Sequence, residues 1–120
     1  MFLGVHYIVE LYGIPKEFLQ SEEKLRQVIG DGIVIGNLHP VGDVYYKFHE
    51  SGVSGVVLLK ESHLSFHTWD EYGYMALDVF SCGDYSNPLE TIKYIAGELG
   101  GEIKYIDNLN RGYINKVGGI

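Results

Sequence analysis

The sequence has a single cysteine, Cys82, which excludes an internal disulfide and a disulfide-stapled secreted scaffold. It also lacks a recognisable signal peptide, because the opening MFLGVHY has neither a basic start nor a long apolar stretch. No apolar run approaches the roughly 20 residues that a membrane-spanning helix needs. These absences predict a soluble, cytoplasmic protein with no membrane partner.

Positive charge is also scarce, since 9 lysines and arginines accompany 16 aspartates and glutamates and give a formal net charge of −7. A nucleic-acid-binding protein needs a basic surface to neutralise phosphates, so nucleic acid is not expected as a partner. An acidic balance is compatible with a cationic or zwitterionic small molecule. It is equally the balance of an ordinary soluble surface.

Common catalytic patterns are missing as well. The sequence has no Gly-x-Ser-x-Gly elbow of a serine hydrolase. His63, His67 and Cys82 are too few and too irregularly spaced for a recognisable metal site, so we expect no metal. A nucleophile pair of Cys82 and His67 stays open, because the two residues could meet on neighbouring strands. On spacing alone, such residues are more often hydrogen-bonded parts of a sheet than catalysts.

The sequence does contain enough hydrophobic residues, 46%, to build a core, and its 120 residues fit one domain, 1–120. Apolar periodicity predicts a helix from Pro15 to Ile29, ended by Gly30–Gly32, and a second helix from Pro88 to Leu99. Runs of β-branched and aromatic residues predict strands at 3–12, 33–38, 44–49, 53–60, 63–69, 74–80 and 103–106.

Strands in succession favour antiparallel pairing. We therefore predict an α+β two-layer sandwich, with two helices packed on one face of a mainly antiparallel sheet. The other face of the sheet then needs a cover. Ten tyrosines suit such a surface, because each combines a large ring with a polar tip.

The most informative stretch is Glu61–Trp69, ESHLSFHTW, followed by Glu71–Tyr74, EYGY. It resembles the processing-site signature of the small prokaryotic S-adenosylmethionine decarboxylases. Upstream, Gly52–Val57 is similar to that family's strand before the cleavage site. Downstream, Leu77–Gly83 is similar to the strand that carries its catalytic cysteine. The resemblance extends over most of the chain, including the order of its elements.

This resemblance implies that the chain cuts itself between Glu61 and Ser62. The Ser62 hydroxyl would attack the Glu61 carbonyl carbon, and elimination and hydrolysis would leave a pyruvoyl group in place of Ser62. That group would serve as the cofactor, with neither pyridoxal phosphate nor a metal. The products would be a β chain, 1–61, and an α chain, 62–120.

The same resemblance assigns further catalytic roles. His67 matches the base of the elimination step, and Ser54 and Cys82 match its processing partners. In turnover, a substrate amine would condense with the pyruvoyl ketone as a Schiff base and lose carbon dioxide. Cys82 would then return a proton to the substrate carbon, acting as a thiol acid.

Four residues are expected to bind the substrate. Phe48 matches an aromatic residue that stacks on adenine, and Glu71 matches an acidic residue that holds ribose hydroxyls. Trp69 would line the same pocket, and Glu10 would face the sulfonium charge. Taken without the motif, Phe48 and Trp69 would be interpreted as core aromatics and Glu71 as a solvated acid.

One position departs from the family pattern, where Asp70 stands in place of the usual proline. An extra carboxylate near the pocket would suit a cationic side chain as well as a sulfonium. The alternatives are therefore an arginine or ornithine decarboxylase on the same scaffold, or a paralogue that does not cleave and has no activity. The resemblance also implies a homodimer of αβ protomers, with two active sites near the interface and residues from both copies.

Overall fold

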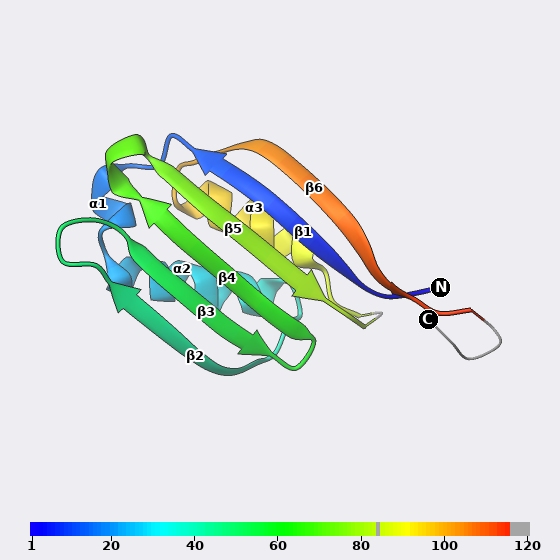
Figure 1. The fold of residues 1–120 in the computed structure, drawn as a ribbon. Coiled ribbons are helices and arrows are strands. Elements are labelled where there is room, and N and C mark those ends of the chain that lie inside the picture. Colours follow the sequence, from blue (N-terminus) through cyan, green and yellow to red (C-terminus); the bar gives the residue numbers. More distant parts are fainter. Residues whose placement is uncertain (84, 116–120) are drawn as a thin grey trace.

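A computed structural model of the chain describes residues 1–83 and 85–115. Its strands form one antiparallel sheet in the order β2-β3-β4-β5-β1-β6, with helices packed behind it (Figure 1). The strands are β1 (Phe2–Tyr12), β2 (Pro40–Lys47), β3 (Val53–Leu59), β4 (Ser62–Trp69), β5 (Tyr74–Ser81) and β6 (Glu102–Tyr113). The helices are α1 (Lys16–Leu19), α2 (Glu22–Ile35) and α3 (Pro88–Glu98), with a short 3-10 turn η1 (Asp70–Tyr72). The predicted α+β two-layer architecture is confirmed.

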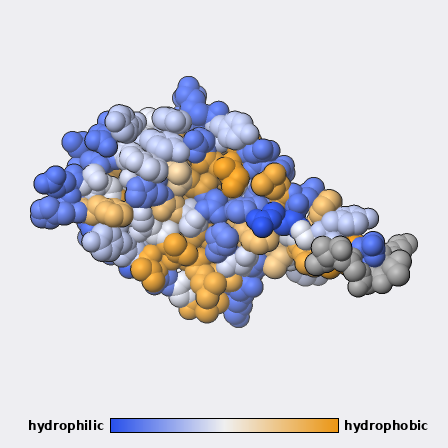
Figure 2. All heavy atoms as spheres, in the orientation of Figure 1, coloured by the Kyte–Doolittle hydropathy of each residue, from blue (hydrophilic) through white to orange (hydrophobic). Residues whose placement is uncertain are grey.

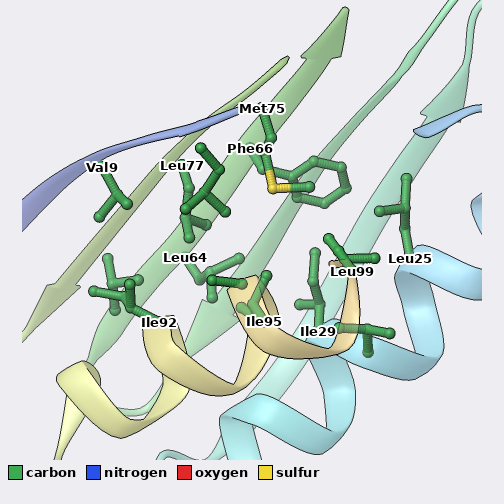
Figure 3. Packing of buried hydrophobic residues seen from close by; sticks show 14 of the residues in the cluster. Val9, Leu25, Ile29, Leu64, Phe66, Met75, Leu77, Ile92, Ile95 and Leu99 are labelled. Atoms are coloured by element: carbon green, nitrogen blue, oxygen red, sulfur yellow. The ribbon is translucent and has the colours of Figure 1, made fainter. Parts of the chain in front are cut away.

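Alternation along the strands separates the two faces of the sheet. In β3 and β5 every second residue is buried, as expected for strands that cover a core on one side. Side chains of β1, β4 and β5 meet those of α2 and α3 in one apolar layer (Figure 3). Its central members are Val9, Leu25, Ile29, Leu64, Phe66, Met75, Leu77, Ile92, Ile95 and Leu99.

The first predicted helix begins where expected, with Pro15 as the N-cap of α1, but it differs from the structure in its middle and at its end. Two helices, α1 and α2, replace it, because the helix is broken at Ser21. The Ser21 side chain caps α2 by accepting a hydrogen bond from the Lys24 N–H at 3.1 Å. The Gly30–Gly32 stop is wrong, because α2 continues to Ile35. At Gly32 the helix approaches α3 so closely that a Cβ atom would lie 3.2 Å from the Ile95 side chain.

Two strand predictions also change. The strand at 33–38 is wrong, since Ile33 is buried in the last turns of α2. The strand at 103–106 is far longer, because β6 pairs with β1 from Glu102 to Tyr113. Its polar, exposed residues give little hydrophobic signal, so pairing with a central strand determines its length.

Within the part of the chain that the structure describes, one face of the sheet carries no helix, and we call it the open face. It is formed by the alternate residues of each strand that point away from α2 and α3, such as His6, Glu10, His67 and Asp78. In the described residues, 1–83 and 85–115, every helix is too short or too polar to span a bilayer.

Candidate active site

The turn between β3 and β4 presents the bond predicted to break. The Glu61 carbonyl oxygen accepts two hydrogen bonds from Cys82, one from its backbone N–H at 3.0 Å and one from its thiol at 2.9 Å. Cys82 reaches this position because it directly follows β5, whose last residue, Ser81, pairs with Ser62. Two donors on one carbonyl oxygen are what a developing oxyanion needs.

Backbone geometry also marks Ser62. Its φ angle is 156°, in a region that residues other than glycine seldom adopt. Such conformations store strain when the surrounding structure holds them in place. We call Glu61, Ser62 and Cys82 the scissile end of the sheet.

A second group of predicted residues lies on the open face. Ser54 on β3 pairs with His67 on β4, and the Ser54 hydroxyl is hydrogen-bonded to Nδ1 of His67. The Phe48 ring lies 5.5 Å from the His67 ring and the Trp69 ring 4.2 Å from it, both nearly perpendicular to the imidazole. We call Phe48, Ser54, His67 and Trp69 the histidine end. Its aromatic rings are partly exposed rather than buried in the core.

Burial lowers the pKa of His67 below its ordinary value of 6.5. The imidazole is therefore neutral near pH 7 and able to accept a proton. Since Nδ1 is engaged with Ser54, Nε2 is the nitrogen left for a reacting group.

The other two predicted substrate residues lie near the histidine end. Glu10 on β1 accepts a hydrogen bond of 2.6 Å from the hydroxyl of Tyr74, whose ring stacks 5.0 Å from Trp69. Desolvation, with the hydrogen bond to Glu10, raises the pKa of Tyr74. Glu71 lies exposed on η1, directly after Trp69 and Asp70. Tyr74 was part of the motif, but nothing in the motif indicated that it would pair with Glu10.

A hollow of about 460 Å³ lies between these groups on the open face. Its lining includes Glu10, Ser54, His67 and Asp78, together with the small side chain of Ala76. Volumes of this order suit small-molecule ligands. The hollow reaches the histidine end, while Ser62 and Cys82 lie outside its lining.

The structure separates the scissile end from the histidine end. Ser62 and His67 are five residues apart on the single strand β4, which places their backbones about 17 Å apart. The suggested meeting of Cys82 with His67 is wrong, because His67 pairs with Ala76, near the opposite end of β5. Both ends belong to one rigid strand, so no loop movement joins them within a chain.

Between the two ends lies a network that sequence reasoning missed. Asp78 Oδ2 lies 2.7 Å from Nε2 of His6 and 2.9 Å from Nε2 of His63, and Oδ1 accepts from the Ser65 hydroxyl. Desolvation opposes the Asp78 charge, but these three hydrogen bonds together lower the pKa of the carboxyl. The even spacing of His63, Ser65 and His67 on β4 was the available signal, because it places all three on one face.

The two imidazoles and Asp78 are close enough to be considered as metal ligands, with their ligand atoms within 4.8 Å of one another. Arg111, however, lies 3.0 Å from Nδ1 of His6 and has only protons to donate. Nδ1 must then accept, so Nε2 carries the proton that points to Asp78. In this tautomer Nε2 of His6 is protonated and hydrogen-bonded to Asp78, so it has no lone pair to bind a metal.

Asp70 does not extend into the hollow. Its side chain is buried, accepting hydrogen bonds from the Gln20 amide at 2.8 Å and the Gly52 N–H at 3.0 Å. Burial disfavours the charge, but these bonds outweigh it and lower the pKa of Asp70. The expectation of an extra carboxylate at the pocket edge is therefore wrong, and the argument it lent to a cationic amino acid disappears.

The open face is also rich in exposed apolar groups. Figure 2, in the same orientation as Figure 1, shows hydrophobic residues over the region of β2 and β3, with hydrophilic residues beside them. Val44, Val56 and Leu58 belong to this patch, and each is at least half exposed. The chain is thus an α+β domain whose open face combines a polar hollow with an exposed apolar patch, as expected of a binding or interaction surface.

Known proteins with similar sequences and a similar fold identify the family of this chain. The family model described as S-adenosylmethionine decarboxylase matches residues 5–112. The S-adenosylmethionine decarboxylase proenzyme of Thermococcus kodakarensis is 38% identical over 92% of this chain and 77% of its own length. That of Picrophilus torridus is 44% identical over 78% of this chain and 72% of its own. The crystal structure of adenosylmethionine decarboxylase from Aquifex aeolicus superposes with a TM-score of 0.84 at 35% identity, covering 96% of this chain and 95% of that one.

The chain belongs to the S-adenosylmethionine decarboxylase family. It is a carboxy-lyase made as a proenzyme, and its reaction serves polyamine synthesis.

Proposed function

We propose that this chain is a self-processing, pyruvoyl-dependent S-adenosylmethionine decarboxylase whose active site is built from two copies. One observation carries the proposal. The Glu61 carbonyl oxygen accepts two hydrogen bonds from Cys82, while His67 lies about 17 Å from Ser62 along β4. The first half of that observation supports cleavage at Glu61-Ser62. The second half supports a partner that supplies the histidine.

Cleavage begins with attack of the Ser62 Oγ on the Glu61 carbonyl carbon. The C–N bond breaks, the nitrogen takes the hydroxyl proton, and an ester replaces the amide. The Cys82 N–H and thiol stabilise the tetrahedral oxyanion on the way. Removal of the Ser62 Cα proton then expels the Glu61 carboxylate and leaves dehydroalanine. Water replaces its nitrogen, ammonia leaves, and the pyruvoyl group remains on an α chain, 62–120, beside a β chain, 1–61.

The base for the Cα proton comes from the second copy. When two open faces pack with their strands antiparallel, the scissile end of one copy lies over the histidine end of the other. In this arrangement Nδ1–H of His67 donates to Ser54, and the Nε2 lone pair meets Ser62 of the partner. The exposed apolar residues Val44, Val56 and Leu58 would be covered at the same time. Both the chemistry and the covering of these apolar residues support a homodimer of αβ protomers.

The substrate would bind where the two ends meet. The pyruvoyl carbonyl supplies the electron sink that makes loss of carbon dioxide feasible. Phe48 and Trp69 offer ring faces for adenine, Glu71 offers a carboxylate for ribose hydroxyls, and Glu10 offers negative charge for the sulfonium. Cys82 returns a proton to the substrate carbon from its exposed thiol, which is not part of a disulfide. A reducing cytoplasm would keep that thiol in the form it needs.

The purified chain should lose its single 13.5 kDa band and yield two fragments, with masses that fit residues 1–61 and a pyruvoyl-bearing 62–120. It should then release labelled carbon dioxide from carboxyl-labelled S-adenosylmethionine and none from arginine or ornithine. Intact mass spectrometry and the release assay measure the two parts separately. A stable uncleaved chain, also inactive, would point to the non-cleaving paralogue, and release from arginine alone would move the substrate to the free amino acids.

Cleavage should also depend on pH through His67. The base must be unprotonated, and burial lowers its pKa below 6.5, so the rate should be flat through neutral pH and fall only below about 6.5. Half-times of cleavage between pH 5 and 8, followed on denaturing gels, measure this. A rate that already declines between pH 8 and 7 would contradict His67 as the base.

A further inference from the structure

His39 lies in the loop between α2 and β2, outside the decarboxylase motif. Leu38, before it, is buried and anchors the loop in the core. The His39 carbonyl accepts a hydrogen bond of 2.8 Å from the Lys60 N–H. The backbone of His39 is thus tied to the turn that contains the scissile bond, whatever its side chain does.

The side chain of Glu61 is held by this loop. Its Oε1 accepts from the His39 backbone N–H at 3.0 Å, and its Oε2 lies 2.6 Å from Nδ1 of His39. Burial disfavours the charged carboxylate, but the His39 contacts outweigh it and lower the pKa of Glu61. The glutamate side chain is 15% exposed and the histidine side chain 55% exposed, so the contact lies at the rim of the turn.

Glu61 is therefore held on two sides. Its carboxylate is bound by His39 from the α2–β2 loop, and its carbonyl oxygen is bound by Cys82 from the end of β5. The peptide plane between these contacts has little freedom to rotate. A carbonyl that rotated off the Cys82 donors would lose the stabilisation of its oxyanion.

We propose that His39 is a positioning residue for self-cleavage, which holds the Glu61 side chain so that the scissile carbonyl stays on the Cys82 donors. The inference rests on the proposed cleavage at Glu61-Ser62. His39 touches neither the attacking oxygen nor the carbonyl, so it acts on the first step, the acyl shift, through Glu61. Glu61 becomes the last residue of the β chain, and His39 then holds that new end against the sheet.

The test compares cleavage rates of the full chain and of His39→Ala and His39→Asn variants. The alanine should slow cleavage about fivefold, the value of a partly exposed charged contact, since the backbone N–H contact to Oε1 remains. Asparagine should recover most of the rate, because its amide can donate to Oε2 in place of Nδ1. Melting temperatures of both variants should match the unchanged chain.

A second readout identifies the step. Hydroxylamine cuts esters far faster than amides, so it releases fragments only from chains that have passed the acyl shift. His39→Ala should show no build-up of a hydroxylamine-sensitive ester, whereas slowing the later elimination would cause one. Arg26→Ala is the matched control, because Arg26 also links α2 to β2 through an exposed contact of 3.0 Å with Asp43. It should cleave at the unchanged rate.

The outcomes separate the two proposals. If the unchanged chain never cleaves, the proposed function fails. If the unchanged chain cleaves, three results would overturn the role of His39. His39→Ala could cleave at the unchanged rate, or it could accumulate the ester. Alternatively, Arg26→Ala could cleave as slowly as His39→Ala.

Discussion

A chain carrying His67→Ala should be cleaved when it is co-expressed with a chain carrying Ser62→Ala, although neither variant is cleaved alone. In the mixed dimer, the His67→Ala chain keeps its own Ser62 and receives His67 from its partner. The other site of that dimer lacks both residues and stays inert. The separation of Ser62 from His67 along β4 is the physical reason, because one strand cannot bring its two ends together. A mass tag on one chain shows which is cut.

The control replaces the Ser62→Ala chain by one that carries both substitutions. This partner can still dimerise but supplies no imidazole, so the His67→Ala chain should stay whole. Size-exclusion chromatography and melting temperature confirm that each variant is folded and paired. If the mixture stays uncut while dimers of both chains form, assembly of the site from two copies is wrong.

Substitutions of Cys82 should affect the rate of self-cleavage and the rate of decarboxylation to different extents. Cys82→Ala removes the thiol donor but leaves the backbone N–H on the Glu61 carbonyl, so cleavage should slow by about tenfold, as expected for loss of a weak oxyanion donor. Turnover of the chains that do mature should fall by about 100-fold or more, because the general acid is gone. Cys82→Ser keeps an O–H donor and should cleave nearly normally. Its hydroxyl is too weak an acid to restore turnover.

Cleavage half-times and carbon dioxide release, each normalised to the amount of pyruvoyl chain, measure the two effects. Ser86→Ala is the matched control, since Ser86 bonds to Ser81 at 2.7 Å in the same loop without touching Glu61. It should leave both rates unchanged. Full turnover by either Cys82 variant would exclude the thiol as the proton donor.

The sequence predicted the class of fold well because its signals are local. Alternating apolar residues in β3 and β5 and the proline at the start of α3 reflect burial and backbone geometry that neighbouring residues already determine. The prediction was wrong where contacts with residues distant in sequence determine the length of a helix or strand. Gly32 is tolerated inside α2 because α3 packs against it, and β6 extends to Tyr113 because β1 lies beside it. Neither contact can be predicted from the residues that neighbour Gly32 or β6 in the sequence.

For the site, the motif supplied residues but no arrangement. Ser54, His67, Phe48 and Trp69 do lie together, yet they lie away from the serine that the motif places in the same string. Asp70 shows the reverse error: it seemed a pocket charge because it follows Trp69, and the turn of η1 directs it to Gly52 instead. His39 could not be found at all, since only the fold brings it to Glu61.

The placement of Ser62 and His67 on a single strand also has a kinetic consequence. Under the proposed mechanism a newly made chain is inert until it meets another, so maturation is second order in chain at low concentration and becomes first order once dimers are saturated. Dilution should therefore lengthen the lag before activity appears, while enzyme that has already matured keeps its cofactor. The reactive carbonyl is generated only in dimers that can use it, and a solitary chain carries no electrophile.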